Sequence, residues 1–199
     1  MQRRFIKQCR SKRAFLNELF VYQSDFPDKP ELIEVIEPHT LVLERIGGIP
    51  YLDADSLTDT MISKLALIIS RFHNITRLED KVLCHWDNQP RNILWYDKKQ
   101  RFVLLDFEDI RLAPPEADLT HLFLFWAEMM SNDVFSVSVK TFVKAYQKTR
   151  KLTPEAWRKE ARKSRQRFDA RRKRHNKLEK TENPDRRKNR RLIIDLQLS

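Results

Sequence analysis

The chain has 199 residues, of which 41% are hydrophobic, and this is enough for one compact domain with a buried core. No apolar run approaches the ~18 residues of a membrane span, the basic N-terminus lacks the apolar core of a secretory signal, and the two cysteines form no C-x-x-C pair. We therefore expect a cytoplasmic protein without a structural zinc site.

The first segment of the chain predicts a strand followed by a helix. Residues 1–8 contain a β-like run that includes Lys7, and Glu18 lies on the helix that follows. Apolar residues recur at the spacing of one face of this helix: Phe15, Leu16, Leu19 and Phe20. Lys7 is either a functional strand lysine or an ordinary surface lysine.

Residues 31–36 and 40–43 predict two further strands, which lead to the only glycines in the chain, Gly47 and Gly48. Glycine permits positive φ and close backbone approach, as a tight turn requires. The next helix is marked by buried positions at the spacing i, i+3, i+4 and i+7: Leu65, Ile68, Ile69 and Phe72.

Two β-rich apolar runs, residues 92–96 and 102–105, flank a polar turn and predict a hairpin. Because a hairpin brings its ends together, Asp87, Asn92 and Asp106 are expected to converge on one spot. Two carboxylates and an amide offer the oxygen ligands that suit a hard cation such as Mg²⁺. The alternative is that Asp87 and Asn92 are turn formers, a common role of both residue types.

The order and spacing of these polar residues carry a resemblance. His85-x-Asp87, with Asn92 five residues after the aspartate, resembles the catalytic loop of the protein-kinase-like superfamily. Pro90, between Asp87 and Asn92, adds a resemblance to the branch that contains aminoglycoside phosphotransferases and choline kinases.

Two later motifs extend the resemblance to that branch. Asp106-Phe107-Glu108 looks like its D-F-G element in the D-F-E form. Asp118-Leu119 resembles the pair that braces the catalytic loop, and His73 is expected to be structural. The resemblance implies an α+β, protein-kinase-like two-lobed fold with a reduced N-terminal lobe, a mainly helical C-terminal lobe and a basic C-terminal helix.

The implied domain organisation follows from the same resemblance and from the distribution of charge. Residues 1–48 would form the reduced N-terminal lobe, residues 49–150 the catalytic lobe, and residues 151–199 a basic helical tail. The tail holds 18 Lys or Arg and 7 Asp or Glu, whereas the rest holds 21 of each, so the whole net charge of +11 lies in the tail.

The resemblance implies an ATP-dependent, Mg²⁺-dependent phosphotransferase that acts on a hydroxyl acceptor, most simply a small molecule. Asp87 would orient and deprotonate the acceptor, and Asn92 and Asp106 would hold Mg²⁺. Lys7, oriented by Glu18, would contact the nucleotide phosphates. Backbone groups from Glu44 to Ile46 would meet the adenine edge.

The sequence departs from the resembled pattern at one point. The chain contains no glycine-rich loop and begins almost at the lysine strand, so the small lobe is expected to be truncated or misassigned at its start, or to function without that loop. An alternative function is therefore a pseudokinase-like binding protein that has lost turnover.

The tail has two interpretations. Thr153-Pro154-Glu155 predicts a helix start, and a thin apolar line follows: Trp157, Ala161, Phe168 and Leu178. The helix either docks on the large lobe through this line, or its basic surface binds a phosphate-rich partner such as nucleic acid or an anionic membrane. In a third functional hypothesis, this binding is the main activity and the kinase-like part is a scaffold.

Overall fold

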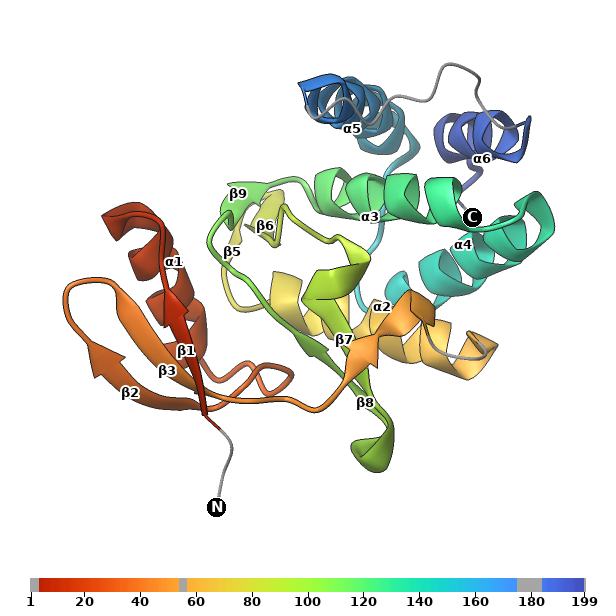
Figure 1. The fold of residues 1–199 in the computed structure, drawn as a ribbon. Helices are drawn as coiled ribbons and strands as arrows, with labels where there is room; N and C mark the ends of the chain where they lie inside the picture. Colours follow the sequence, from red (N-terminus) through yellow and green to blue (C-terminus); the bar gives the residue numbers. More distant parts are fainter. Residues whose placement is uncertain (1–3, 54–56, 175–183, 199) are drawn as a thin grey trace.

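The computed structural model describes residues 4–53, 57–174 and 184–198 (Figure 1). Its strands are β1 (Arg4–Gln8), β2 (Leu32–Ile36), β3 (Thr40–Glu44), β4 (Ile49–Pro50), β5 (Arg77–Leu78), β6 (Lys81–Cys84), β7 (Ile93–Tyr96), β8 (Arg101–Leu104) and β9 (Arg111–Ala113). Its α-helices are α1 (Lys12–Gln23), α2 (Asp59–His73), α3 (Pro115–Met129), α4 (Asn132–Tyr146), α5 (Pro154–Arg174) and α6 (Pro184–Asp195), and three short 3₁₀ turns are η1 (Tyr51–Asp53), η2 (Pro90–Asn92) and η3 (Asp97–Lys99).

A small lobe is built from a three-stranded antiparallel sheet in the order β1-β3-β2, with α1 beside it (Figure 1). The central strand β3 buries Leu41, Val42 and Leu43, which explains its continuous apolar sequence. The register places Lys7 opposite Leu41. Helix α1 begins after Ser11, whose Oγ accepts a hydrogen bond from the Ala14 N–H and so satisfies one unpaired helical donor.

The predicted apolar face of α1 is partly wrong. Phe15 is buried, but Leu16 and Phe20 are 51% and 48% exposed. The inward face is instead formed by Ala14, Phe15, Glu18, Val21 and Tyr22. Its centre is the carboxylate of Glu18 rather than a leucine, because this face of α1 meets the lysine of β1.

The predicted hairpin is confirmed as β7 and β8, paired antiparallel with Ile93 opposite Leu104 and Tyr96 opposite Arg101. Beyond the ladder, the Leu105 N–H donates to the Asn92 carbonyl at 2.9 Å. This bond holds the residues that precede β7 against those that follow β8, as the hairpin argument required.

The connection from β3 to the large lobe passes through the two glycines. Neither has positive φ, so the expectation of a left-handed turn is wrong. The expected close approach is confirmed for Gly48, where a Cβ atom would lie 2.9 Å from the Trp95 carbonyl oxygen. Gly47 has no atom within 4 Å of the same position, so the constraint belongs to Gly48 alone.

The large lobe is mainly helical. The four residues predicted to be buried on α2 are at most 3% exposed, and α3 is buried nearly all round, as its apolar sequence indicates. Aromatic rings fill the space between α3 and α4. The ring centroid of Phe142 lies 5.3 Å from that of Phe123 and 5.7 Å from that of Trp126. Among the described helices, none has both the length and the apolar character that a bilayer crossing requires.

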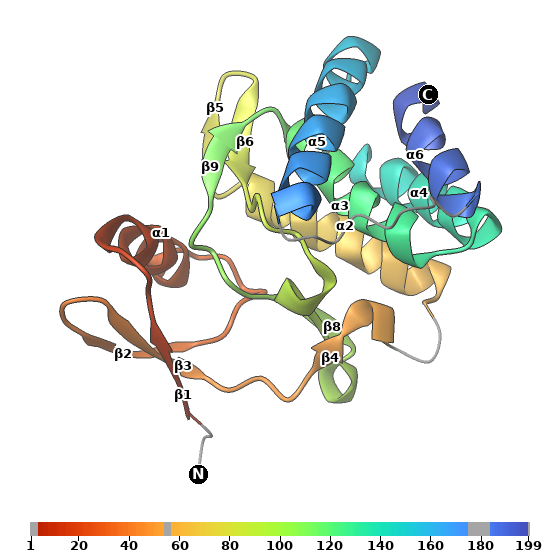
Figure 2. The same ribbon diagram turned by 45° about the horizontal axis from the view of Figure 1, so that its top comes forward.

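The basic tail forms α5 and α6, which pack on α3 and α4 (Figures 1 and 2). Trp157, Ala161 and Phe168 are buried as the docked-helix interpretation expects, whereas Leu178 lies outside the described residues. The Trp157 indole N–H donates to the Ile193 carbonyl at 2.7 Å, so the two tail helices are joined inside the core.

Candidate active site

A cavity of about 470 Å³ opens between the small-lobe sheet and the β7–β8 hairpin. Five of the seven predicted site residues line it: Lys7, Glu44, Ile46, Asn92 and Asp106. The remaining lining is largely apolar and includes Phe5, Leu43 and Leu94. An apolar slot with a few converging polar groups has the character of a small-molecule binding site.

Lys7 connects the small lobe to the residue after β8. Its Nζ lies 2.5 Å from Glu18 Oε1, 2.8 Å from Asp106 Oδ1 and 3.9 Å from Glu108 Oε1. Burial alone would lower the pKa of the Lys7 ammonium, but the carboxylates of Glu18 and Asp106 outweigh burial and raise it. Lys7 is therefore a fixed positive charge inside the cavity rather than one of the surface lysines.

Asp106 is held in an uncommon conformation. Its φ is 65°, in the left-handed region that non-glycine residues rarely adopt. Burial would raise the pKa of its carboxyl, but the Lys7 ammonium more than offsets this and the pKa is lowered. Next to it, Phe107 is fully buried and stacks on Phe72 with ring centroids 5.6 Å apart, which fixes the turn in the core.

The predicted adenine-facing segment lines the cavity at Glu44 and Ile46. The Glu44 N–H already donates to the Glu31 carbonyl at 2.8 Å. Within the described part of the chain, Ile46 makes no backbone hydrogen bond. The predicted contact with an adenine edge therefore suits the Ile46 amide better than that of Glu44.

Asp87 lies in the loop between β6 and η2, with its side chain only 9% exposed. Its Oδ2 accepts hydrogen bonds from Gln89 Nε2 at 2.7 Å and from Asn92 Nδ2 at 3.2 Å. Its Oδ1 lies 3.0 Å from Nη1 of Arg171, on α5. Asn92 Nδ2 also donates to the Asp87 carbonyl at 2.9 Å, so Asp87 and Asn92 form one unit.

Asp118 braces this loop from the buried start of α3. Its Oδ2 accepts from the His85 N–H at 2.9 Å and contacts His73 Nε2 at 3.0 Å, and its Oδ1 accepts from the Trp86 N–H at 2.9 Å. Burial opposes ionisation of Asp118, but His73 and these N–H groups hold the pKa of its carboxyl down at about 2. His85 Nε2 lies 2.9 Å from the Leu105 carbonyl oxygen, so the loop is also tied to the Asp106 turn.

The predicted metal ligands fit a hard divalent cation. The Nδ2 atom of Asn92 points to Asp87, which leaves Asn92 Oδ1 as the donor oxygen of that amide. Asp106 uses Oδ1 for Lys7 and retains Oδ2. One amide oxygen and one carboxylate oxygen in the same cavity match the preference of Mg²⁺ for few protein ligands alongside substrate phosphates.

The sequence motifs predicted neither the contact of Arg171 with Asp87 nor the two arginines that flank the preceding residue, Trp86. In the sequence, Arg171 is one of many basic residues of the tail. No local signal could have found its contact with Asp87, because Arg171 lies 84 positions from Asp87 and the contact exists only after α5 docks.

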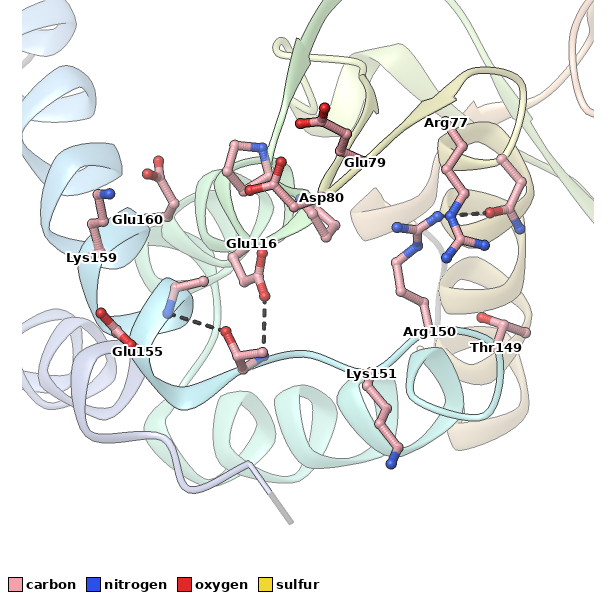
Figure 3. Close-up of a pocket in the computed structure, with 15 residues that line it drawn as sticks. Arg77, Glu79, Asp80, Glu116, Thr149, Arg150, Lys151, Glu155, Lys159 and Glu160 are labelled. Carbon is pink, nitrogen blue, oxygen red and sulfur yellow. Dashed lines mark hydrogen bonds between the residues drawn. The ribbon is translucent and has the colours of Figure 1, made fainter.

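A larger cavity, about 900 Å³, lies elsewhere (Figure 3). It is bounded by the β5–β6 turn, the start of α3, the α4–α5 connection and the first turns of α5. Acidic and basic side chains of both signs surround it, including Glu79, Asp80, Arg150 and Lys151. None of the seven predicted site residues lines this cavity, so we do not assign the candidate active site to it.

Comparison with known proteins identifies the class of fold. The model of the phosphotransferase enzyme family matches residues 75–159, the segment that holds Asp87, Asn92, Asp106 and Asp118. No curated protein sequence matches the chain. For the central part of the chain, this match confirms the predicted resemblance to phosphotransferases.

Solved structures of kinases extend the likeness over nearly the whole chain. Amicoumacin kinase hAmiN, solved with AMP-PNP, Ca²⁺ and Ami, is 14% identical, with a TM-score of 0.71 over 98% of this chain and 82% of that chain. Choline kinase LicA from Streptococcus pneumoniae is 15% identical, with a TM-score of 0.62 over 98% of this chain and 85% of that chain.

An ethanolamine kinase from Plasmodium vivax is 12% identical, with a TM-score of 0.61 over 81% of this chain and 66% of that chain. At such low identities the likeness concerns the fold. The predicted α+β, two-lobed kinase-like fold with a small sheet portion is confirmed.

Proposed function

We propose that the protein is an ATP-dependent phosphotransferase that transfers the γ-phosphoryl group to a hydroxyl of a small molecule. The observation that carries this proposal is that Asn92, which is hydrogen-bonded to Asp87, lines the same cavity as Lys7 and Asp106. Lys7, Glu18 and Asp106 form one unit within 2.8 Å contacts, and Asp87 and Asn92 form the other. A nucleotide in the cavity would place its phosphates between them.

Phosphoryl transfer requires mainly positioning and charge neutralisation, and these residues offer both. Lys7 would hold the phosphates, and Glu18 would keep the lysine in place. The acceptor oxygen would attack the γ-phosphorus while the bond to ADP breaks, and the hydroxyl proton would pass to Asp87. Asn92 and Asp106 would hold Mg²⁺, which would neutralise charge on the phosphates.

The amicoumacin kinase structure supports the assignment of nucleotide and divalent cation, because that protein was solved in complex with AMP-PNP and Ca²⁺. The kinases with a similar fold also favour a small-molecule acceptor, since amicoumacin, choline and ethanolamine are small. A competing proposal is a nucleotide-binding protein without turnover.

Thermal denaturation with nucleotide tests the binding step. ATP with Mg²⁺ is expected to raise the melting temperature, since a ligand at a hundred times its Kd stabilises the folded state by about 2.7 kcal/mol. ATP without the metal is expected to give no such rise, because the proposed site holds the phosphates through Mg²⁺. Asp106→Asn should abolish the shift. Asp97→Asn, in the exposed η3 turn of the hairpin, is the matched control and should keep it.

Release of ADP in the presence of hydroxyl acceptors tests the transfer step. ADP formation that depends on the acceptor supports the phosphotransferase, and nucleotide binding without any ADP formation supports the binding protein. An equal nucleotide shift in the wild type and in Asp106→Asn would remove Asp106 from the site.

A further inference from the structure

The basic helix α5 contributes directly to the candidate site. Its C-terminal end comes down to the loop before β7 (Figure 2). There, Nη1 of Arg171 lies 3.0 Å from Asp87 Oδ1. Among the described residues, Asp87 is the only carboxylate within 4 Å of Arg171, whose side chain is 48% exposed. The guanidinium therefore stands at the open side of the proposed base, with room for a second partner.

Two more arginines flank the residue that precedes Asp87. The guanidinium of Arg111 lies 4.3 Å from the ring centroid of Trp86, and that of Arg167 lies 4.7 Å from it. Arg167 is held in place by Ser164 Oγ at 2.8 Å. The indole supports both cations through its π-system while leaving their N–H donors available to other partners.

The arginines next to Trp86 and Asp87 have fewer close carboxylate partners than some other arginines of the tail. Other arginines of the tail are matched by carboxylates: Arg172 and Arg190 contact Glu128 at 3.0 and 2.7 Å. Arg171 has Asp87 as its carboxylate partner, Arg167 lies 3.9 Å from Glu160, and Arg111 lies near Asp109, whose backbone carbonyl accepts from Arg111 Nε at 3.4 Å. A cationic acceptor such as a quaternary amine would be repelled here, and an anionic one would be attracted.

We propose, building on the proposed phosphotransferase function, that the hydroxyl acceptor carries a phosphate or carboxylate group and that Arg171, with Arg167 and Arg111 nearby, binds this anion. The planar fork of arginine donors suits both groups, because it can bind two oxygens at once. Arg171 is thus a residue that determines acceptor specificity.

The same contact links recognition to chemistry. Without an anionic acceptor, Asp87 is fully engaged: Oδ1 by Arg171, and Oδ2 by Gln89 and Asn92. An acceptor anion competes for Arg171 and draws the guanidinium away from Oδ1. The freed oxygen can then accept the hydroxyl proton as the acceptor oxygen bonds to the γ-phosphorus and ADP leaves. An acceptor without the anion leaves Arg171 on the base.

Matched acceptors test this proposal. ADP release is measured with glycerol 3-phosphate, glycerate, glycerol and choline at equal ionic strength. The wild type is expected to prefer one or both anionic compounds over glycerol, and to reject choline. The first two compounds distinguish a phosphate from a carboxylate, since they share a small hydroxylated skeleton.

Variants of Arg171 identify the residue. Arg171→Gln is expected to lower kcat/KM for the anionic acceptor by roughly 10- to 100-fold, the usual loss for a charged hydrogen bond, and to raise kcat/KM for glycerol, because Asp87 Oδ1 is no longer occupied by the guanidinium. Arg171→Lys should retain part of the preference. The matched control is Arg162→Gln, an exposed arginine of α5 nine residues away and therefore on the opposite helix face, which should behave as the wild type.

Binding of inorganic phosphate separates failure of this inference from failure of the proposed function. Saturating Mg²⁺-ADP is present, and sodium chloride is the ionic-strength control. Phosphate should raise the melting temperature of the wild type and Arg162→Gln more than that of Arg171→Gln, even if no phosphoryl transfer occurs. Equal shifts in all three proteins, or a wild-type preference for glycerol or choline, would overturn the anionic acceptor.

Discussion

The two sides of the cleft are built in opposite ways. On the proposed nucleotide side, Lys7 of the small lobe meets two carboxylates, Glu18 and Asp106, within 2.8 Å, and negative charge is in excess. On the proposed acceptor side, Asp87 is paired with a single cation, Arg171 from α5, which is half exposed. The residues that match the resembled family lie in short ordered motifs. Arg171, the residue proposed to select the acceptor, comes instead from a segment 84 positions away from Asp87.

Replacing Asp87 would give the largest effect and the sharpest separation of the two sides. Asp87→Ala removes the proposed proton acceptor, and loss of such a group costs ~10²–10⁴ in rate. ADP release with an acceptor should fall by that factor, while stabilisation by Mg²⁺-ATP remains. Full turnover in this variant would contradict the role of Asp87 as proton acceptor. Loss of nucleotide binding along with turnover would show that Asp87 also serves the nucleotide side.

Replacing Lys7 tests the ion pairs on the proposed nucleotide side. Lys7→Met leaves the carboxylate of Glu18, whose side chain is fully buried, without its cation. Breaking a buried pair in this way costs about 3 kcal/mol or more in the free energy of unfolding, measured by urea denaturation. The control is Lys12→Met on the exposed start of α1, which should change stability little. A small cost for Lys7→Met would mean that Glu18 is not held by the ion pair.

The brace of the acceptor loop predicts a pH dependence. The pKa of the Asp118 carboxyl is about 2 in the folded protein against an ordinary value of 3.8, so the unfolded chain binds protons more readily. Its contribution is present above about pH 4 and is lost as the pH falls toward 2, and a shift of this size corresponds to about 2 kcal/mol. Urea denaturation across this range checks it, because the stability difference between wild type and Asp118→Asn should shrink with falling pH. A difference that stays constant would contradict the lowered pKa.

The glycines give the smallest effect and test the connection between the two lobes. Gly48→Ala would place a Cβ atom 2.9 Å from the Trp95 carbonyl oxygen, and relieving this overlap should destabilise the protein by about 1–3 kcal/mol. Gly47→Ala meets no atom within 4 Å and has no positive φ, so it should be neutral or stabilise by about 0.4–1 kcal/mol. Differential scanning calorimetry of both variants provides the comparison, and equal melting temperatures would show that the backbone yields at Gly48.

Sequence patterns predicted most of the architecture where local rules apply. The hairpin, the buried face of α2 and the start of α5 at Pro154 follow from periodicity, turn residues and capping. The face of α1 was missed because Glu18 is buried by its ion pair with Lys7, and hydrophobic periodicity gives no weight to a paired charge.

The candidate site was predictable to the extent that motifs place residues at the cleft. Lys7, Asn92 and Asp106 line one cavity, but the roles assigned to them stay predictions, as do the boundaries at residues 48 and 150. Arg171 was not predictable, because the position of α5 is set by the packing of Trp157 and Phe168. A cytoplasmic location, and a nucleic-acid or membrane partner for the tail, also stay predictions.

The way the tail is anchored has a consequence for how this protein can change over evolutionary time. Trp157 and Phe168 complete the hydrophobic core, while Arg167 and Arg171 on the same helix contact Trp86 and Asp87. A single helix thus serves both folding and selectivity, on different faces. Exposed arginines can be exchanged one at a time without loss of the fold, so selectivity can drift by point substitution, whereas loss of the whole segment would remove the scaffold along with the charge.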